Sequence, residues 1–268
     1  FFKQKTAYES MPSLVGAEMC IRDRFESAEL AYESKPGQFL MVDCNIGQGS
    51  NENLFLRRPL AVHRVDLEKD QISILFQVVG KGTLALSKAT AGDLIDVIGP
   101  LGRPIEIDSS VENIVFVSGG LGIASLTSLI DVAVARNLKV TLLAGARNSY
   151  RLYPSQLLPR GVTEMTATDD GSAGIRAPVT HLVSQVQENT DIIYACGPLP
   201  MLKALSEMAV DGTLTVNTIG LLESQMACGL GICKGCVVDT DLGDKLICLD
   251  GPAFDLREIR WESQFSPV

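Results

Sequence analysis

The stretch Met226-Ala-Cys-Gly-Leu-Gly-Ile-Cys-Lys-Gly-Cys236 places three cysteines on one short loop, and a fourth, Cys248, follows after eleven intervening residues. Four residues separate Cys228 from Cys233 and two separate Cys233 from Cys236. This is the spacing of the ligands of a plant-type 2Fe-2S cluster. The glycines between the ligands let the backbone turn tightly around a small cluster, and amides of the loop can donate to the sulfurs and tune the potential. We therefore expect Cys228, Cys233, Cys236 and Cys248 to hold a 2Fe-2S cluster.

Two other uses of these cysteines remain open, a structural zinc site and a pair of disulfides. Zinc sites usually pair cysteines two to four residues apart on separate knuckles, whereas three of these thiols share one loop. Disulfides belong to oxidising compartments, and nothing else in the sequence indicates one. The spacing thus favours the cluster over both.

The composition indicates a soluble globular chain. Its 268 residues are 46% hydrophobic and 21% charged, which leaves room for two domains and a small appendage. A net charge of −9 argues against nucleic acid or an anionic membrane as the main partner. The uncharged run 114–130 contains three glycines, so a strand, a turn and a helix explain it better than a membrane span. No export signal is recognisable, and we expect a cytoplasmic protein.

The first 24 residues have neither helical nor strand periodicity. They resemble translated sequencing-adapter read-through, so we expect a non-native segment fused to a truncated gene. A disordered tail is the alternative. We place native sequence from Phe25 onward, with domains at 25–108, 109–220 and 221–268.

Residues 25–108 show short runs of strand type separated by turns rich in glycine and proline, which predicts a small antiparallel barrel. The expected strands are 38–42, 59–65, 71–79 and 93–98. Arg58 stands at the head of an apolar strand, and Gly82 and Thr83 open a helix; both features suit a bound phosphate. Each alone is weak evidence, because such residues also serve as ordinary strand starts and turns.

Residues 109–220 alternate between strand and helix, which predicts a doubly wound parallel sheet. The expected strands are 113–118, 139–144, 162–167, 191–196 and 214–219, and the expected helices are 123–136, 178–187 and 201–208. Gly119, Gly120 and Gly122 follow the first strand, where a pyrophosphate can approach a helix N-terminus, although the third glycine of the dinucleotide fingerprint is missing. Tight packing of strand against helix is the alternative.

Cys196, Gly197 and Pro198 end a later strand at the same edge of this sheet, so they are also candidates for contact with a nicotinamide cofactor. For Cys196 itself, we favour a buried packing role over a thiol that faces nicotinamide. His63 and His181 have no second ligand or nucleophile at useful spacing, so we expect packing or solvation for both.

The order of these parts, from Arg58-Pro-Leu-Ala61 to the four-cysteine loop, resembles the electron transfer subunits of NAD-dependent dihydroorotate dehydrogenase B, within the ferredoxin reductase superfamily. The resemblance covers roughly residues 25–261. It implies an FAD between barrel and nucleotide domain, an NAD that meets the flavin, and a cluster that leads to an FMN in a separate catalytic subunit, in a heterotetramer of two copies of each. The residues that it assigns to FAD are Arg58, Pro59, Leu60, Ala61, Leu75, Phe76, Gln77, Gly82 and Thr83. Two departures are Ala61, where many relatives have Ser, and the unusual N-terminal segment, which would leave the barrel truncated and open at one edge.

The resemblance implies an oxidoreductase subunit that passes electrons from the partner's FMN through 2Fe-2S and FAD to NAD+, in pyrimidine synthesis, with no catalytic base of its own. One alternative is the small subunit of sulfide dehydrogenase or of NADH-dependent ferredoxin:NADP oxidoreductase, although those relatives tend to have Asp where this chain has Cys228. Another is a non-catalytic zinc-binding or nucleotide-sensing module. The residues alone do not decide between NAD and NADP, because Arg147 and Arg151 could hold a 2′-phosphate.

Overall fold

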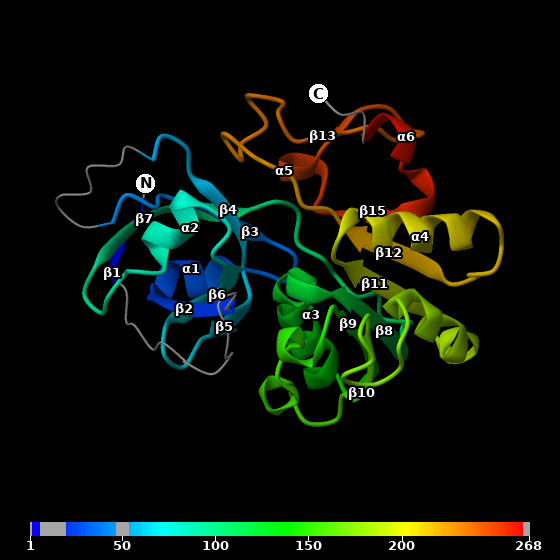
Figure 1. The fold of residues 1–268 in the computed structure, drawn as a ribbon. Helices are drawn as coiled ribbons and strands as arrows, with labels where there is room; N and C mark the ends of the chain where they lie inside the picture. The colour runs from blue at the N-terminus through cyan, green and yellow to red at the C-terminus, as the bar shows by residue number, and fades with distance from the viewer. Residues whose placement is uncertain (1, 6–19, 47–53, 265–268) are drawn as a thin grey trace.

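In the computed structural model, which describes residues 2–5, 20–46 and 54–264, an antiparallel barrel stands beside a parallel sheet with helices on both faces (Figure 1). The C-terminal segment runs along the top of both. This arrangement confirms the expected fold class, a barrel followed by an α/β domain and a small cysteine-rich segment.

The barrel sheet has the strand order β4-β3-β7-β1-β2-β6-β5. Its elements are β1 (Phe2–Lys5), β2 (Cys20–Glu26), α1 (Ala28–Glu33), β3 (Phe39–Val42), β4 (Arg58–Ala61), β5 (Arg64–Asp66), β6 (Gln71–Gln77), α2 (Lys81–Leu86) and β7 (Leu94–Leu101). The chain between β4 and β5 crosses from one side of the sheet to the other, because the amide of Val62 donates to Gln38 and the amide of His63 donates to Ser73. The β4–β5 segment therefore closes the barrel.

Residues 1–24 lack strand periodicity, yet the parts of this segment that the structure describes form two strands. β1 pairs with β7, and β2 pairs with β6 along its whole length from Cys20 to Glu26. The two strands meet each other at Lys5 and Glu26. Strand ladders are made by backbone groups, so the edges of β6 and β7 can pair with an extended chain even where its side chains lack the usual pattern. Because β1 and β2 pair with β7 and β6, the expectation of an open barrel edge is wrong. The foreign origin of the segment stays a prediction.

One acidic side chain of β2, that of Asp23, lies in the apolar interior of the barrel. Asp23 lies on the same face of the strand as Phe25, and it is only 2% exposed. Neither oxygen of its carboxyl group has a hydrogen-bond partner within the described chain. Burial raises the pKa of Asp23 to about 6. An apolar residue would fit here at lower cost.

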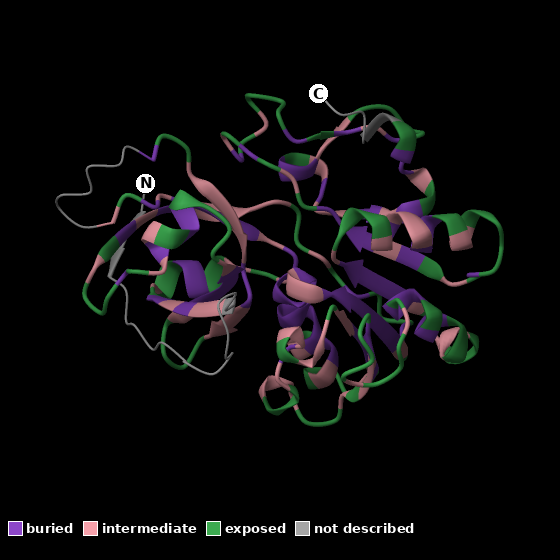
Figure 2. Ribbon diagram, in the orientation of Figure 1, coloured by how far each residue is buried: buried purple, intermediate pink, exposed green. Residues whose placement is uncertain are grey.

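The second sheet has the order β10-β9-β8-β11-β12-β15, and all its strands are parallel except β15. Its elements are β8 (Asn113–Gly119), α3 (Ile123–Ala135), β9 (Lys139–Ala146), β10 (Thr163–Thr168), β11 (Ile192–Cys196), α4 (Leu199–Val210), β12 (Asn217–Leu221) and β15 (Ala253–Asp255). Both faces are buried (Figure 2). Ile114 and Phe116 of β8 pack on the core that includes α3, whereas Val115 and Val117 pack on the core that includes α4. The continuous apolar run of β8 follows from this burial on two sides.

Two helical elements differ from the expectation. The segment expected as a helix at 178–187 is a 3₁₀ helix, Val179–Gln185, and α1 in the barrel was not anticipated. Further 3₁₀ turns are Gly120–Gly122, Ser149–Arg151, Ser155–Leu157 and Gln187–Asn189. None of the described helices is long and apolar enough to cross a bilayer.

The C-terminal segment joins both domains. It contains β13 (Val237–Val238), β14 (Lys245–Leu246), α5 (Ile247–Asp250), the 3₁₀ turn Leu256–Glu258 and α6 (Trp261–Gln264). Its β15 pairs with β12 at the edge of the parallel sheet. Its Cys236 and Cys248 share one buried core with Phe39 and Met41 of the barrel. The segment is therefore packed against both domains.

Polar contacts also hold the barrel against α3. Arg64 donates two hydrogen bonds to the carboxylate of Asp131, at 2.7 and 3.0 Å. The fully buried His63 lies 3.2 Å from the carbonyl oxygen of Ala124 and 3.1 Å from the hydroxyl of Tyr153. Burial lowers the pKa of His63 to about 3, so its ring is neutral at pH 7. The expectation of packing for this histidine agrees with these contacts.

Candidate functional site

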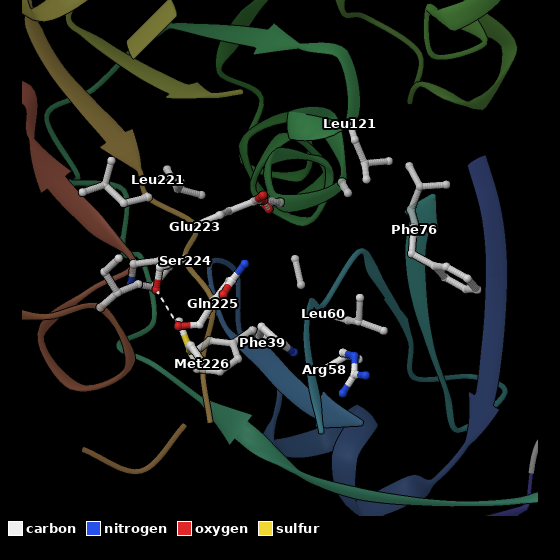
Figure 3. A pocket seen from close by; sticks show the side chains of 18 of the residues that line it. Phe39, Arg58, Leu60, Phe76, Leu121, Leu221, Glu223, Ser224, Gln225 and Met226 are labelled. Carbon is white, nitrogen blue, oxygen red and sulfur yellow. Dashed lines mark hydrogen bonds between the residues drawn. The ribbon is translucent and has the colours of Figure 1, made fainter. Parts of the chain in front are cut away.

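A cavity of about 430 Å³ lies where the barrel, α3 and the C-terminal segment meet (Figure 3). The barrel contributes Gly37, Phe39, Arg58, Pro59, Leu60, Ala61, Leu75, Phe76, Gln77, Val79 and Thr83. The rest of the wall is Leu121, Ala124, Ser125, Leu221–Met226, Ile247 and Pro252. The lining is largely apolar with a few polar groups, as is typical of sites for an organic cofactor.

Most of the residues assigned to FAD meet at this cavity. All of them except Gly82 line it. Gly82 lies outside the wall, and a Cβ there would lie 2.5 Å from Nε of Arg58, so glycine leaves room for the guanidinium in this position beside the start of α2. Thr83 fixes the turn by accepting hydrogen bonds from the amides of Val79 and Gly80, at 3.0 and 3.3 Å. This geometry suits an anionic group held by Arg58 next to the turn.

Glu223 is a cavity residue that sequence reasoning missed. Its carboxylate accepts a hydrogen bond from Oγ of Ser125 at 3.0 Å and a longer one from Sγ of Cys196 at 3.7 Å. Arg58 and Glu223 are the charged side chains of the described cavity wall. The available signal was a lone carboxylate two residues after the end of β12, at the edge of the sheet where ligands bind.

Cys196 lies behind Glu223. Its side chain is fully buried, and it lines neither cavity described here. Burial, followed by the charge of Glu223, raises the pKa of Cys196 well above its usual range. Cys196 is therefore a protonated thiol that donates to Glu223, in line with the packing role that we favoured.

A second cavity, of about 350 Å³, lies at the carboxyl edge of the parallel sheet. Its wall includes Gly119, Gly120 and Pro198, and it also includes Arg147, Arg151 and Asp169 at the ends of neighbouring strands. Gln77 and Leu121 line both cavities, so the two are neighbours. A dinucleotide on the glycine turn can therefore reach the first cavity.

The two remaining glycines of the predicted nucleotide site serve close packing. A Cβ on Gly122 would collide with the carbonyl oxygen of Cys196. A Cβ on Gly197 would lie 2.8 Å from the amide nitrogen of Gly119. These positions let the start of α3 approach the end of β11, which is the packing role that we named as the alternative for the turn.

The four cysteines of the C-terminal segment differ in their burial and in their contacts. Cys236 and Cys248 are buried with their sulfurs 3.2 Å apart, whereas Cys233 is exposed. Sγ of Cys228 accepts hydrogen bonds from the amides of Leu230 and Cys233, at 3.3 and 3.4 Å. Burial opposes ionisation of Cys228, yet these amides lower its pKa to about 7. Burial and the neighbouring Cys236 raise the pKa of Cys248 to about 12.

This donor set fits a 2Fe-2S cluster. Such clusters are bound by four cysteine thiolates, and amide donors to the sulfurs adjust their potential. Within the described ranges, no three His, Cys, Asp or Glu side chains converge as they would around one metal ion. Cys236 and Cys248 are buried with their sulfurs in contact, and Cys228 and Cys233 are more exposed, so the fit rests on the four thiols and the amide donors.

The cluster loop lies directly against the first cavity, which we call the flavin cavity because most of the residues assigned to FAD line it. Gly229 has a φ of +69°, and a Cβ there would lie 2.6 Å from Cγ of Met41 in β3. Ile247, which lines the flavin cavity, is the residue before Cys248. The expected cluster ligand Cys248 is thus the direct sequence neighbour of a residue in the cavity wall, so the cysteine segment also helps to build this cavity.

Known proteins share both the fold and the cysteine segment. Residues 223–260 match the iron-sulfur cluster binding domain of dihydroorotate dehydrogenase B. The chain is 37% identical to the dihydroorotate dehydrogenase B (NAD(+)) electron transfer subunit of Caldanaerobacter subterraneus subsp. tengcongensis, covering 87% of this chain and 92% of that protein. It is 33% identical to the subunit of the same name from Desulforamulus reducens, covering 89% and 91%.

Solved structures share the fold of this chain. The chain matches the NADH-dependent reduced ferredoxin-NADP oxidoreductase structure with a TM-score of 0.83 at 28% identity, covering 97% of this chain and 90% of that one. A ferredoxin reductase in carbazole 1,9a-dioxygenase shares the fold with a TM-score of 0.63 at 15% identity, covering 80% and 65%. The extent of the sequence match to the curated relatives, together with the cysteine segment, decides the family: this chain belongs to the electron transfer subunits of NAD(+)-dependent dihydroorotate dehydrogenase B.

Proposed function

We propose that this chain carries electrons from the FMN of a dihydroorotate-oxidising catalytic subunit, through a 2Fe-2S cluster and FAD, to NAD+ in pyrimidine synthesis. The observation that carries the proposal is the continuity of the sites. Cys248 adjoins Ile247 in the wall of the first cavity, and Gln77 and Leu121 join that cavity to the second. In this proposal the cluster site neighbours the FAD site, and the FAD site neighbours the NAD site.

A flavin suits the middle one of these three sites, because it exchanges hydride with nicotinamide and single electrons with an iron-sulfur cluster. The chain contributes binding and shielding. Arg58 offers forked donors to a phosphate, and apolar side chains such as Leu60 and Leu121 keep water from the cavity. Glu223, held by Ser125, presents a fixed acceptor to the cavity. We assign proton removal from dihydroorotate to the partner.

The partner docks on the cysteine loop in this proposal, as two catalytic and two electron transfer subunits. Leu230 and Ile232, between the cluster ligands, are 44% and 79% exposed, and Leu249 beside Cys248 is 49% exposed. Exposed apolar side chains gathered on one surface are typical of protein interfaces. Docking here brings the partner's flavin near the cluster.

Leu230→Glu tests this route. We expect it to reduce dihydroorotate-to-NAD+ turnover of the assembled complex by about tenfold, because a charge at an apolar interface weakens docking. Oxidation of NADH by a small artificial acceptor should be unchanged. Val210→Glu, on a 71% exposed side chain at the end of α4, is the matched control and should leave both activities intact. Equal loss of both activities, or turnover of dihydroorotate by this chain alone, would contradict the proposal.

The match to the NADH-dependent ferredoxin-NADP oxidoreductase structure supports a second candidate, a flavin and iron-sulfur subunit of that kind of enzyme. The identity of the partner separates the two. Restoration of dihydroorotate oxidation by an FMN-containing dihydroorotate dehydrogenase subunit supports the first proposal, and failure of such a subunit to bind would favour the second. A colourless protein that contains zinc would exclude both.

A further inference from the structure

One histidine lies where the barrel, α3 and the segment after β9 meet. His63 is fully buried, and it lies two residues after Ala61 in the wall of the flavin cavity. Its Nδ1 lies 3.2 Å from the carbonyl oxygen of Ala124, a residue of the same wall near the start of α3. Its Nε2 lies 3.1 Å from the hydroxyl of Tyr153, two residues after Arg151 in the wall of the second cavity. His63 therefore joins segments that line both cavities.

The contacts of His63 fix which nitrogen of its ring carries the proton. A carbonyl oxygen only accepts hydrogen bonds, so Nδ1 donates to Ala124. Burial lowers the pKa of His63 to about 3, so the ring is neutral and Nε2 carries no proton at pH 7. Burial raises the pKa of the Tyr153 hydroxyl, which therefore keeps its proton and donates a hydrogen bond to Nε2. Tyr153 thus holds the ring with Nδ1 facing Ala124.

α3 rests on the barrel along one face. Ala124 and Asp131 are seven residues apart, which is about two helical turns, so both lie on that face. His63 contacts the first, and Arg64 donates two hydrogen bonds to the second, at 2.7 and 3.0 Å. Leu121 and Ala124 line the flavin cavity, whereas Asp131 does not belong to the described wall of either cavity. Of the two contacts, that of His63 therefore sets the position of the cavity end of α3.

We propose that His63, oriented by Tyr153, is a positioning residue for hydride transfer between NADH and the flavin, an inference that rests on the proposed function. It sets the gap between β4 and the start of α3, beside Leu121, which lines both cavities. The flavin and nicotinamide sites meet at this gap, and hydride transfer depends steeply on how the donor and the acceptor are placed.

Stopped-flow reduction of the flavin by NADH tests this role in the cofactor-loaded protein. His63→Leu removes both hydrogen bonds, so the limiting rate constant of flavin reduction should fall by roughly tenfold to a hundredfold, while the Kd of NADH stays within about twofold. Tyr153→Phe removes only the hydroxyl that orients the ring, so this rate constant should fall by a smaller factor. His63→Asn should recover most of the rate, because its amide nitrogen takes the place of Nδ1 beside Ala124.

Asp131→Ala is the matched control. It removes two hydrogen bonds from the same face of α3, at the end away from the cavities. Both Asp131→Ala and His63→Leu should lower the Tm, but Asp131→Ala should leave the rate constant of flavin reduction unchanged. An equal loss of rate in Asp131→Ala, or a rate in His63→Asn as low as in His63→Leu, would assign the effect to loosened packing and overturn the inference. An unchanged rate in His63→Leu, or in Tyr153→Phe if His63→Leu does not fold, would also overturn it.

Amide hydrogen exchange gives a readout that needs no turnover. The segment 119–125 should exchange faster in His63→Leu than in the native protein, and Asp131→Ala should leave the exchange of this segment unchanged. Unchanged exchange of 119–125 in His63→Leu would overturn the inference. Failure of the native protein to oxidise NADH would instead overturn the proposed function, and the comparison of exchange would still decide whether His63 positions the start of α3.

Discussion

Replacing the buried carboxyl group of Asp23 should stabilise this protein at neutral pH. Burial raises the pKa of Asp23 from 3.8 to about 6. The folded state therefore holds the proton more tightly than the unfolded chain. The cost of ionising Asp23 is negligible well below pH 3.8, grows between pH 4 and 6, and is constant above pH 6. A shift of this size corresponds to about 3 kcal/mol at pH 7.5 and about 1 kcal/mol at pH 4.5.

Thermal unfolding of the cofactor-loaded protein at these two pH values measures the effect. Asp23→Asn should raise the Tm by roughly 6–12 °C at pH 7.5 and by roughly 2–4 °C at pH 4.5. Asp23→Val should add a gain that is the same at both pH values, since it also removes an unpaired polar group from the core. Glu26→Gln, on an exposed residue of the same strand, removes an equal charge and should change little. If Asp23→Asn did not raise the Tm at pH 7.5, or raised it equally at pH 7.5 and pH 4.5, the destabilising buried charge of Asp23 would be refuted.

Three further predictions concern the cofactor sites and the domain contact. Arg58→Ala should weaken FAD binding by about 1.5–3 kcal/mol, because a charge-assisted contact to phosphate is lost; flavin retained after dialysis measures this, and full retention would contradict the role. Cys228→Ser should remove the cluster and leave part of the flavin, since Arg58 and Thr83 remain; the iron-to-flavin ratio checks it, and full iron content would exclude Cys228 as a ligand. The pKa of His63 is about 3 in the folded protein and 6.5 in the unfolded chain, so protons bind the unfolded chain first as the pH falls below 6.5. The free energy of unfolding is therefore lower by about 2 kcal/mol at pH 5. His63→Gln should therefore show a smaller drop in Tm between pH 7 and pH 5 than the native protein, and an equal drop would show that another group is responsible.

The sequence alone predicts the parts of this protein whose chemistry is local. The cysteine ligands fall within 21 residues, so their spacing carries most of the geometry of the cluster. The apolar run of β8 and the glycine turn after it likewise predict a buried parallel strand with a ligand at its end. Local sequence patterns did not predict β2, because the hydrogen bonds between strands are made by backbone groups that every residue type except proline carries.

Only the tertiary structure shows which residues from distant parts of the chain lie in contact or line the same cavity. The carboxylate of Glu223 is held by hydrogen bonds from Ser125 and Cys196, which lie 98 and 27 residues away in the chain. Ile247 reaches the flavin cavity only because the cysteine loop packs on β3 of the barrel. Asp23 is costly only because the barrel closes around it. In each case the physical cause is the desolvation or the contact that arises when separate elements pack together. The spacing of residues along the chain does not show which elements will pack against each other.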